Sequence, residues 1–314
     1  MKILITIIMG LLSLLTYGQQ DAGFSMYYFN PVYVNPGYAG SREVFSGSMV
    51  NRSQWASMPG SPVTQSLSIH SAIPNSNVGL GFQFYNDHTG PMKNTGIKLT
   101  YAYHLPVTDD SHLSFGLSGM TNNIRIKLND VNVQDENDPA FTGETYSNWV
   151  FDAGTGLYFY QPLFYLGISV NHLLQSKFGL EDTTEPDLAK FYRQYYLTSG
   201  IVFHLNKSID FRPSLLFKYV KAAPLVTEFT GSFLIKKKVF LGAGFRTSKR
   251  VNMPGTDNML IAILELDFTR FLRLGYSYDF YLNRTGNYNS GTHEIMLGWD
   301  FGKSPTKTTN PRYF

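Results

Sequence analysis

The sequence has no cysteine, few charged residues and no helix-length apolar segment beyond its first residues. Without cysteine we expect no disulfide scaffold, no thiol chemistry and no S-acylated lipoprotein anchor. Charged residues make up 16% of the chain and the net charge is only +3, so a nucleic-acid-binding surface is not indicated. After the amino terminus, no segment contains the roughly 20 apolar residues that a membrane-spanning helix requires.

Aromatic residues and glycine are abundant instead. The 314 residues include 24 Phe, 21 Tyr, 3 Trp and 28 Gly. Phe and Tyr favour pleated, half-buried surfaces, and Gly permits the close approach of another backbone. This composition favours an all-β protein.

The first residues have the pattern of a targeting segment. Lys2 precedes an apolar run from Ile3 to Leu15, and a small-residue site ends at Gly18. This order is typical of a cleaved signal peptide, here over residues 1–18, and the run is short for the rival interpretation, a transmembrane helix. We therefore expect the mature protein to leave the cytoplasm.

Apolar and polar residues alternate with a period of two along most of the remaining chain. In "VGLGFQFY", Leu80, Phe82 and Phe84 alternate with glycine and glutamine, and "LRLGYSYDF" and "EIMLGWDF" repeat the pattern near the end. About fourteen segments of about 9–11 residues are predicted as strands. Their centres lie near residues 49, 68, 82, 100, 117, 155, 168, 200, 215, 231, 243, 263, 276 and 297.

The predicted connections are alternately short and long. Those after even-numbered strands are short, at residues 74–77, 107–110, 161–162, 206–208, 236–238 and 269–270. Those after odd-numbered strands are longer, notably 123–148, 172–194, 247–257 and 282–290. An even strand number with short periplasmic turns and long extracellular loops is typical of bacterial outer-membrane barrels.

The fold prediction is an all-β, transmembrane, antiparallel up-and-down outer-membrane β-barrel of about 14 strands over residues 44–301. Apolar side chains would face lipid and polar ones a lumen, and closure would leave no unpaired edge in hydrocarbon. Six aromatic residues at strand ends are expected in interfacial girdles: Trp55, Tyr85, Trp149, Tyr160, Tyr219 and Tyr281. A soluble β-sandwich is the alternative.

Several segments fall outside the predicted wall. Residues 19–43 are rich in proline, glycine and aromatics, and could form a periplasmic strap on the rim, a lumen plug or a docking arm. Residues 302–314 form a tail, and both termini are expected in the periplasm. The acidic loop at 130–144 lacks the ligand and glycine pattern of a calcium site. Lys236, Lys237 and Lys238 form a basic turn, expected to be solvated, with lipid head groups or an acidic partner as alternatives.

No catalytic constellation is found. The seven histidines and the many serines form no nucleophile elbow and no metal-binding pair. We therefore predict no enzyme activity, no cofactor and no metal site.

Several motifs in order resemble one family. They are "YFNPVYVNPGYAGS" (28–41), "NRSQW" (51–55), "GSPVTQSLSIHSAI" (60–73), "VGLGFQFYNDHTGP" (78–91), "YAYHL" (101–105), "LGYSYDFY" (274–281), "NSGTHEIMLGWDF" (289–301) and "PRYF" (311–314). Together they span nearly the whole mature chain and resemble the PorP/SprF family of the type IX secretion system and its gliding-motility branch. The sequence departs at Gly37, where the family more often has alanine.

The resemblance implies a non-enzymatic outer-membrane barrel that assists the export or surface retention of secreted proteins such as adhesins. It implies two kinds of protein partner, a periplasmic ring-forming lipoprotein complex and a cognate adhesin-like cargo bound through its C-terminal domain. The motif residues would buttress loops and turns or contact a partner: Asn35, Pro36, Tyr38, Gly40, Arg52, Gln54, Trp55, Asn86, Asp87, Gly90, Pro91, Tyr278, Asp279, His293 and Glu294.

A second hypothesis is a channel for small solutes or hydrophobic substrates. About fourteen strands leave a sizeable interior unless something fills it. Charged residues of the predicted lumen face could then line a path: Lys98, Arg212, Lys218, Arg246, Arg273 and Asp279.

Overall fold

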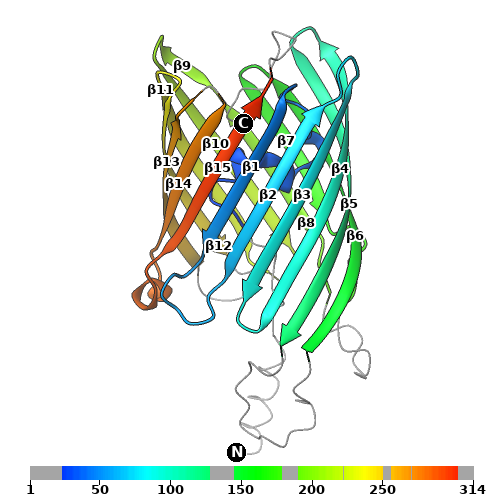
Figure 1. Ribbon diagram of the computed structural model, residues 1–314. Helices are drawn as coiled ribbons and strands as arrows, with labels where there is room; N and C mark the ends of the chain where they lie inside the picture. The colour runs from blue at the N-terminus through cyan, green and yellow to red at the C-terminus, as the bar shows by residue number, and fades with distance from the viewer. Residues whose placement is uncertain are drawn as a thin grey trace, which may run out of the picture.

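The computed structural model describes residues 23–127, 145–178, 190–221, 223–249, 256–269 and 271–302. In these residues, fifteen strands form one antiparallel sheet that closes into a barrel (Figure 1). The strands are β1 (Phe45–Ser53), β2 (Val63–Ala72), β3 (Val78–Thr89), β4 (Met92–Thr108), β5 (Ser111–Lys127), β6 (Thr145–Gln161), β7 (Phe164–Asn171), β8 (Gln194–Ile201), β9 (Phe203–Asn206), β10 (Ile209–Val220), β11 (Leu225–Ile235), β12 (Val239–Lys249), β13 (Thr256–Asp267), β14 (Leu272–Tyr281) and β15 (Thr292–Phe301).

The barrel closes between its first and last strands. β1 pairs with β15 from Phe45↔Phe301 to Ser53↔His293, and neighbouring strands elsewhere pair in sequence order. β8 and β9 both pair with β10, and β9 continues β8 after Val202. The two therefore act as one interrupted strand, and the barrel wall has fourteen strands. The predicted 14-strand antiparallel barrel is confirmed.

The two ends of the barrel differ in their connections. The end that carries the turns β2–β3, β4–β5, β6–β7, β9–β10, β11–β12 and β13–β14 is here called the short-turn end, and the opposite end the long-loop end. Two connections at the long-loop end are nevertheless tight: residues 90–91 join β3 to β4, and residues 221–224 join β10 to β11. The predicted strict alternation of loop length is therefore wrong at these two places.

Strand length also departs from the prediction. β4, β5 and β6 are each 17 residues long. Parts of the predicted long loop at 123–148 belong to the ends of β5 and β6, because their backbone ladder continues to the pair Lys127↔Thr145. The prediction from side-chain alternation stopped where polar residues such as Asn122 and Asn123 interrupt the apolar pattern.

Alternate side chains face opposite sides of the wall, as the period of two predicts. Large apolar residues such as Leu99, Leu117 and Phe151 are 61–69% exposed on the outer face. Their strand neighbours on the inner face, including Thr100, Ser118 and Asp152, are at most 6% exposed. The inner face is not uniformly polar, however, since Leu216, Ile261 and other apolar side chains also point inward.

The predicted aromatic girdle is only partly right. Trp149 and Tyr219 are 62% and 49% exposed on the outer face. Tyr85, Tyr160 and Tyr281 point inward and are at most 7% exposed. The prediction placed these three tyrosines on the outer face. In the structure they alternate with outward-facing residues of their strands and therefore point into the lumen.

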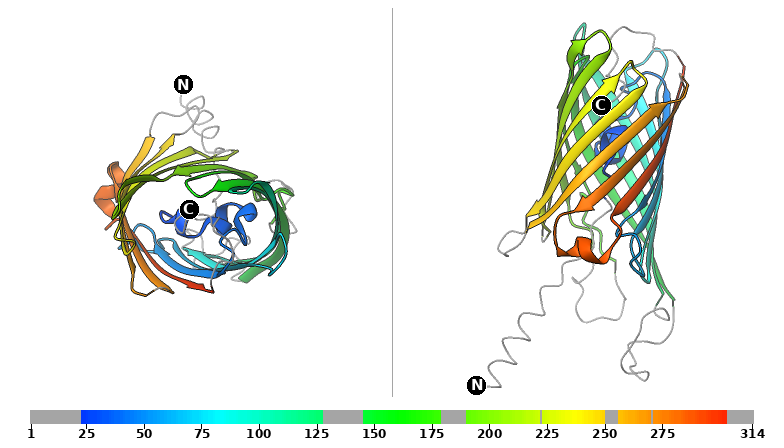
Figure 2. Two further views of the ribbon diagram at one scale, coloured as in Figure 1. Left: turned by 90° about the horizontal axis from the view of Figure 1, so that it is seen from above. Right: turned by 90° about the vertical axis from the view of Figure 1, so that its left-hand side faces the viewer.

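Residues 23–43 lie inside the barrel (Figure 2). They contain three short helices, η1 (Tyr27–Phe29), α2 (Pro31–Val34) and η2 (Pro36–Tyr38). Pro31 and Pro36 occupy first helical positions, where a missing N–H costs no hydrogen bond. In the described part of the chain, no helix has the length and hydropathy needed to cross a membrane.

Candidate functional site

The segment of residues 23–43, here called the plug, runs along the lumen from the long-loop end to the short-turn end. It begins beside Arg52 and Arg246, and it ends with Arg42 beside Asp300, a residue near the end of β15. Seen along the barrel axis, it occupies the middle of the ring of strands (Figure 2, left). The plug and its contacts with the wall form the candidate functional site.

A buried charge cluster fixes the start of the plug. The Ser25 and Met26 backbone N–H groups each donate to Glu294 at 2.9 Å. Arg52 bridges the two wall carboxylates, at 2.9 Å from Glu294 and 2.8 Å from Asp279. Two consecutive N–H groups on one carboxylate, with a guanidinium behind it, form a charge-assisted network that fixes the backbone position.

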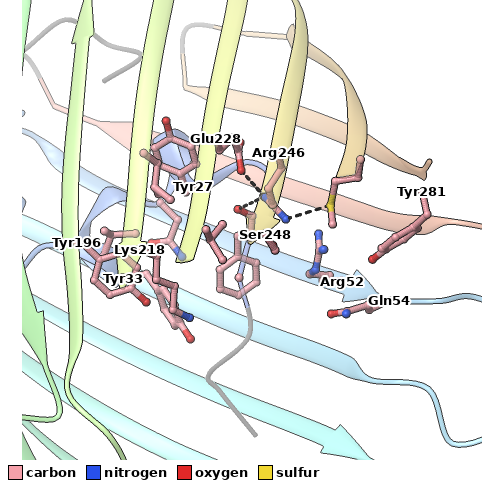
Figure 3. Close-up of a pocket in the computed structure, with 17 residues that line it drawn as sticks. Tyr27, Tyr33, Arg52, Gln54, Tyr196, Lys218, Glu228, Arg246, Ser248 and Tyr281 are labelled. Atoms are coloured by element: carbon pink, nitrogen blue, oxygen red, sulfur yellow. Dashed lines mark hydrogen bonds and ion pairs between the residues drawn. The ribbon is translucent and has the colours of Figure 1, made fainter. Parts of the chain in front are cut away.

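A second ion pair extends this cluster. The Arg246 guanidinium lies 2.5 Å from Glu228, its partner in the β11–β12 register, and donates to the Phe24 carbonyl at 3.2 Å (Figure 3). The same guanidinium donates to Ser25 Oγ at 3.2 Å. The start of the plug is thus held from β1, β12, β14 and β15 together.

The charges of this cluster are almost fully removed from solvent. Asp279 and Glu294 are 0% exposed, Glu228 is 1% exposed and Arg52 is 2% exposed. An uncompensated ion in such a place costs several kcal/mol, so each carboxylate depends on its guanidinium.

The end of the plug is held by another set of charges at the short-turn end. Arg42 of the plug and Arg273 of β14 lie 2.8 and 3.2 Å from Asp300. Ser46 at the start of β1 donates to the same carboxylate at 2.8 Å. Asp300 therefore joins the plug to the strand pair at which the barrel closes.

Inward-facing glycines make room for the middle of the plug. A Cβ on Gly116 would lie 2.1 Å from the Gly37 nitrogen, and a Cβ on Gly79 would lie 1.9 Å from the Ala39 oxygen. Gly156 and Gly167 leave similar space for the Asn35 side chain. These four glycines, here called the glycine cradle, let the plug backbone contact the wall directly.

Asn35 connects the plug to two strands. Its Nδ2 donates to the Leu157 carbonyl at 2.9 Å and to the Ile168 carbonyl at 3.4 Å. Its Oδ1 accepts the Gly37 N–H at 2.8 Å, which caps η2.

Replacing Asn35 with aspartate tests this connection. Aspartate retains the acceptor for the Gly37 N–H but cannot donate to the wall carbonyls, and its charge would be buried. We expect the free energy of unfolding to fall by about 2–3 kcal/mol. Urea unfolding of the purified barrel, followed by tryptophan fluorescence, measures this change. Asn51→Asp in β1 is the control, because Asn51 is exposed, and equal losses in both variants would contradict the role given to Asn35.

Aromatic side chains of the plug cover the apolar part of the lumen wall. Phe29 packs edge-on against Phe240 with ring centroids 5.0 Å apart, and the plug and wall share one apolar cluster. This explains the apolar inward side chains of the wall, because they face the plug and not water. Burial raises the pKa of the Tyr27 and Tyr28 phenols well above their ordinary value, so both stay neutral.

A cavity of about 250 Å³ lies beside the start of the plug (Figure 3). Tyr27, Tyr33, Tyr196 and Tyr281 contribute aromatic surface to it, and its charged lining consists of Arg52, Lys218, Glu228 and Arg246. Within the described residues, no group of three or more His, Asp or Glu side chains could hold a metal ion.

The structure divides the motif residues predicted from sequence into three groups. The first group lies in the plug or its charge clusters: Asn35, Pro36, Tyr38, Gly40, Arg52, Asp279 and Glu294. Tyr38 packs between His70 and Tyr158, and Gly40 has a φ of +84° and lies against Gly79. These residues are brought together.

The second group ties loops at the long-loop end. The Trp55 backbone N–H donates to Thr292 Oγ1 at 3.2 Å, and the Gly90 N–H, at a φ of +53°, donates to the Gly60 carbonyl at 2.9 Å. Gln54 and Pro91 accompany them, through backbone hydrogen bonds to Pro62 and Lys127.

The third group lies on strands, away from the plug. Asn86 and Asp87 accept cross-strand hydrogen bonds from Thr95 and Thr64. Tyr278 and His293 lie on the outer face, opposite each other in the β14–β15 register, with ring centroids 5.1 Å apart.

The sequence analysis did not select several of the residues that hold the plug. Glu228, Asp300 and the glycine cradle were not selected, and Ser25 and Met26 contribute through their backbone. The six charged residues predicted to line an open path are at most 8% exposed. A search for opposite charges facing inward on paired strands would have found Glu228 and Arg246.

The comparisons with known proteins fit this architecture. The CymD monoaromatic hydrocarbon channel has a TM-score of 0.55 and 10% identity over 90% of this chain and 94% of that chain. The Ralstonia pickettii toluene transporter TbuX has a TM-score of 0.52 and 11% identity over 91% of this chain and 97% of that chain. At these identities the likeness shows the fold alone. No curated protein matches the sequence.

A family model does match, and over far more than half of the chain. The match extends over residues 16–299, which include the plug, the charge cluster at its start and nearly all of the barrel wall. The chain belongs to the family of the type IX secretion system membrane protein PorP/SprF, and it has the fold of an outer-membrane β-barrel.

Proposed function

We propose that this protein is a non-enzymatic accessory barrel of the type IX secretion system, which assists the export or surface retention of cognate secreted proteins such as adhesins. The observation that carries the proposal is the plug. The lumen holds the chain's own segment, anchored by charges at both ends and by the glycine cradle between them. A barrel filled in this way acts through its rims and loops and not by conducting cargo through its centre.

The partners in this proposal are a periplasmic ring lipoprotein complex at one rim and the C-terminal domain of a cargo at a rim or loop. The short-turn end would face the periplasm, as in other bacterial barrels. β15 ends at this rim, which fits a periplasmic carboxyl terminus. Gly23 lines the cavity together with Gln54 and Ser248 near the long-loop end. The residues before Gly23 lie outside the described chain, and a periplasmic amino terminus stays a prediction.

Deleting the gene is expected to remove one or a few proteins from the cell surface, with their degraded or intracellular forms accumulating. Quantitative proteomics of surface-shaved cells measures this loss, and the wild-type gene should restore the surface proteins. A gene encoding Arg125→Met, a change on the outer face, should restore them equally. An unchanged surface proteome in the deletion strain would contradict the proposal.

A channel is the second candidate function, favoured by the cavity beside the plug and by the fold shared with a hydrocarbon channel and a toluene transporter. Planar-bilayer recording of the purified barrel distinguishes the two. The accessory proposal expects an electrically silent protein, whereas steady conductance with the plug in place would favour the channel.

A further inference from the structure

Four lysines cluster at one sector of the short-turn end. Lys207 lies in the β9–β10 turn, and Lys236, Lys237 and Lys238 form the β11–β12 turn. The Lys236 N–H donates to the Ser208 carbonyl at 2.6 Å, which joins the two turns. All four lysines are exposed, and together they are called the lysine patch.

The backbone of the β11–β12 turn does not suit lysine. Lys236 and Lys237 have φ angles of 51° and 54°, in the left-handed region. They are the two central residues of a turn closed by the Lys238 N–H, which donates to the Ile235 carbonyl at 3.0 Å. Two consecutive residues in the left-handed region are the reason that Asn-Gly is preferred at such positions. Lysine at both positions costs conformational free energy, so the turn itself gives no reason for these side chains.

Within the described residues, the barrel provides no ion-pair partner for the lysine patch. None of the four lysines forms an ion pair with another described residue. Asp210, a carboxylate of the β9–β10 hairpin, is already engaged by His204 at 2.6 Å and by Arg212 at 3.3 Å.

The outer face directly beneath the lysine patch is apolar. Leu205, Phe233 and Leu241 are 43–57% exposed and lie two or three residues from a lysine of the patch. A strand rises about 3.3 Å per residue, so in a tilted wall three residues span roughly 7 Å of depth. A lysine side chain spans a similar distance. An ammonium group at its end can therefore reach the level of the lipid phosphates while Leu205, Phe233 and Leu241 face the acyl chains.

The opposite sector of the same rim has the reverse charge. The β4–β5 turn carries the exposed Asp109 and Asp110 above the apolar Leu105 and Val107. Among the described turns of this rim, the basic charge is therefore concentrated in one sector, and a lipid attracted by it would bind at one place on the barrel and not around the whole rim.

We propose that the lysine patch binds the phosphate of an anionic phospholipid, of the phosphatidylglycerol or cardiolipin class, whose acyl chains lie against Leu205, Phe233 and Leu241. The inference does not depend on the secretion role, because it concerns only the barrel and its membrane. The lysines supply the attraction for the head group, and the apolar outer face supplies the surface for the chains.

The double substitution Lys236→Asn with Lys237→Gly tests the proposal without endangering the fold. It removes two charges and installs the residues that the turn geometry prefers, so the melting temperature should stay equal or rise. In native mass spectrometry of the full-length mature protein with added phosphatidylglycerol, the affinity should fall about tenfold or more. Lys93→Asn, on the outer face near the long-loop end, should change neither quantity.

Three results would overturn the proposal. One is unchanged phosphatidylglycerol binding in the double variant. Another is equally tight binding of phosphatidylethanolamine or lipid A by the wild-type protein. The third is a variant that keeps its phospholipid and loses the binding of a poly-glutamate peptide, which would make the patch a protein docking surface.

Discussion

Replacing Arg52 with methionine is expected to lower the free energy of unfolding by about 3–5 kcal/mol and to loosen the start of the plug. The substitution leaves Asp279 and Glu294 without their shared guanidinium, although both are 0% exposed. Methionine fills a similar volume, so the loss would come from the unpaired charges and not from a cavity. The Ser25 side chain also loses its 3.0 Å hydrogen bond from Arg52.

A single cysteine reports on the plug directly, because the sequence contains none. Val32 is 1% exposed in the plug, and Val32→Cys is a nearly isosteric change. Maleimide should label this cysteine slowly in the parent and about tenfold faster or more when Arg52→Met is added, as expected for a segment that opens locally. Urea unfolding of the same two proteins gives the stability change.

Arg125→Met provides the matched control, since Arg125 is exposed and lies on β5, away from the plug. Its labelling rate and stability should equal those of the parent. A triple variant with Arg52→Met, Asp279→Asn and Glu294→Gln should recover part of the lost stability, because no buried charge is then left unpaired. If Arg52→Met behaves like Arg125→Met, the charge cluster does not hold the plug.

Gly116→Ala is expected to displace the middle of the plug and to cost about 3 kcal/mol of stability. The added Cβ would lie 2.1 Å from the Gly37 nitrogen and 2.3 Å from the Pro36 carbonyl carbon. Both are backbone atoms on a segment anchored at its two ends, so no side-chain rotation relieves the overlap. The plug must move, and planar-bilayer recording should show openings that are absent from the wild-type protein.

Gly119→Ala is the control for this change, in the same strand and with the same added methyl group. A Cβ on Gly119 has no heavy atom within 4 Å. Its stability should match the wild type or exceed it slightly, because alanine restricts the unfolded chain. Equal effects of the two substitutions would show that the cradle does not depend on glycine.

The barrel wall could be predicted from local sequence. Each hairpin pairs residues that are close in the chain. The alternation of apolar and polar side chains along a strand indicates which of them face outward. The segments centred near residues 49 and 297 were therefore recognisable as strands. The parity of Tyr85 and Tyr281 was misjudged because a tyrosine suits a membrane interface as well as a packed lumen.

The site could be predicted only in part. Arg52 and Glu294 were both selected, but through a resemblance and not as a pair. They are directly opposed in the β1–β15 register, across the closure of the barrel, and are 242 residues apart in the chain. No local pattern indicates a pairing across that closure.

The amino-acid sequence by itself determined the strands, their two faces and the residue types at the turns, because these follow from the backbone period and from neighbours along the chain. Only the tertiary structure decided what fills the lumen. Burying Asp279, Glu294 and Glu228 requires guanidinium and N–H donors from segments far apart in the chain, and the close contact of Gly37 with Gly116 requires a closed wall. Partners of this kind exist only after the barrel has closed around the plug, so the function proposed for the segment rests on three-dimensional contacts.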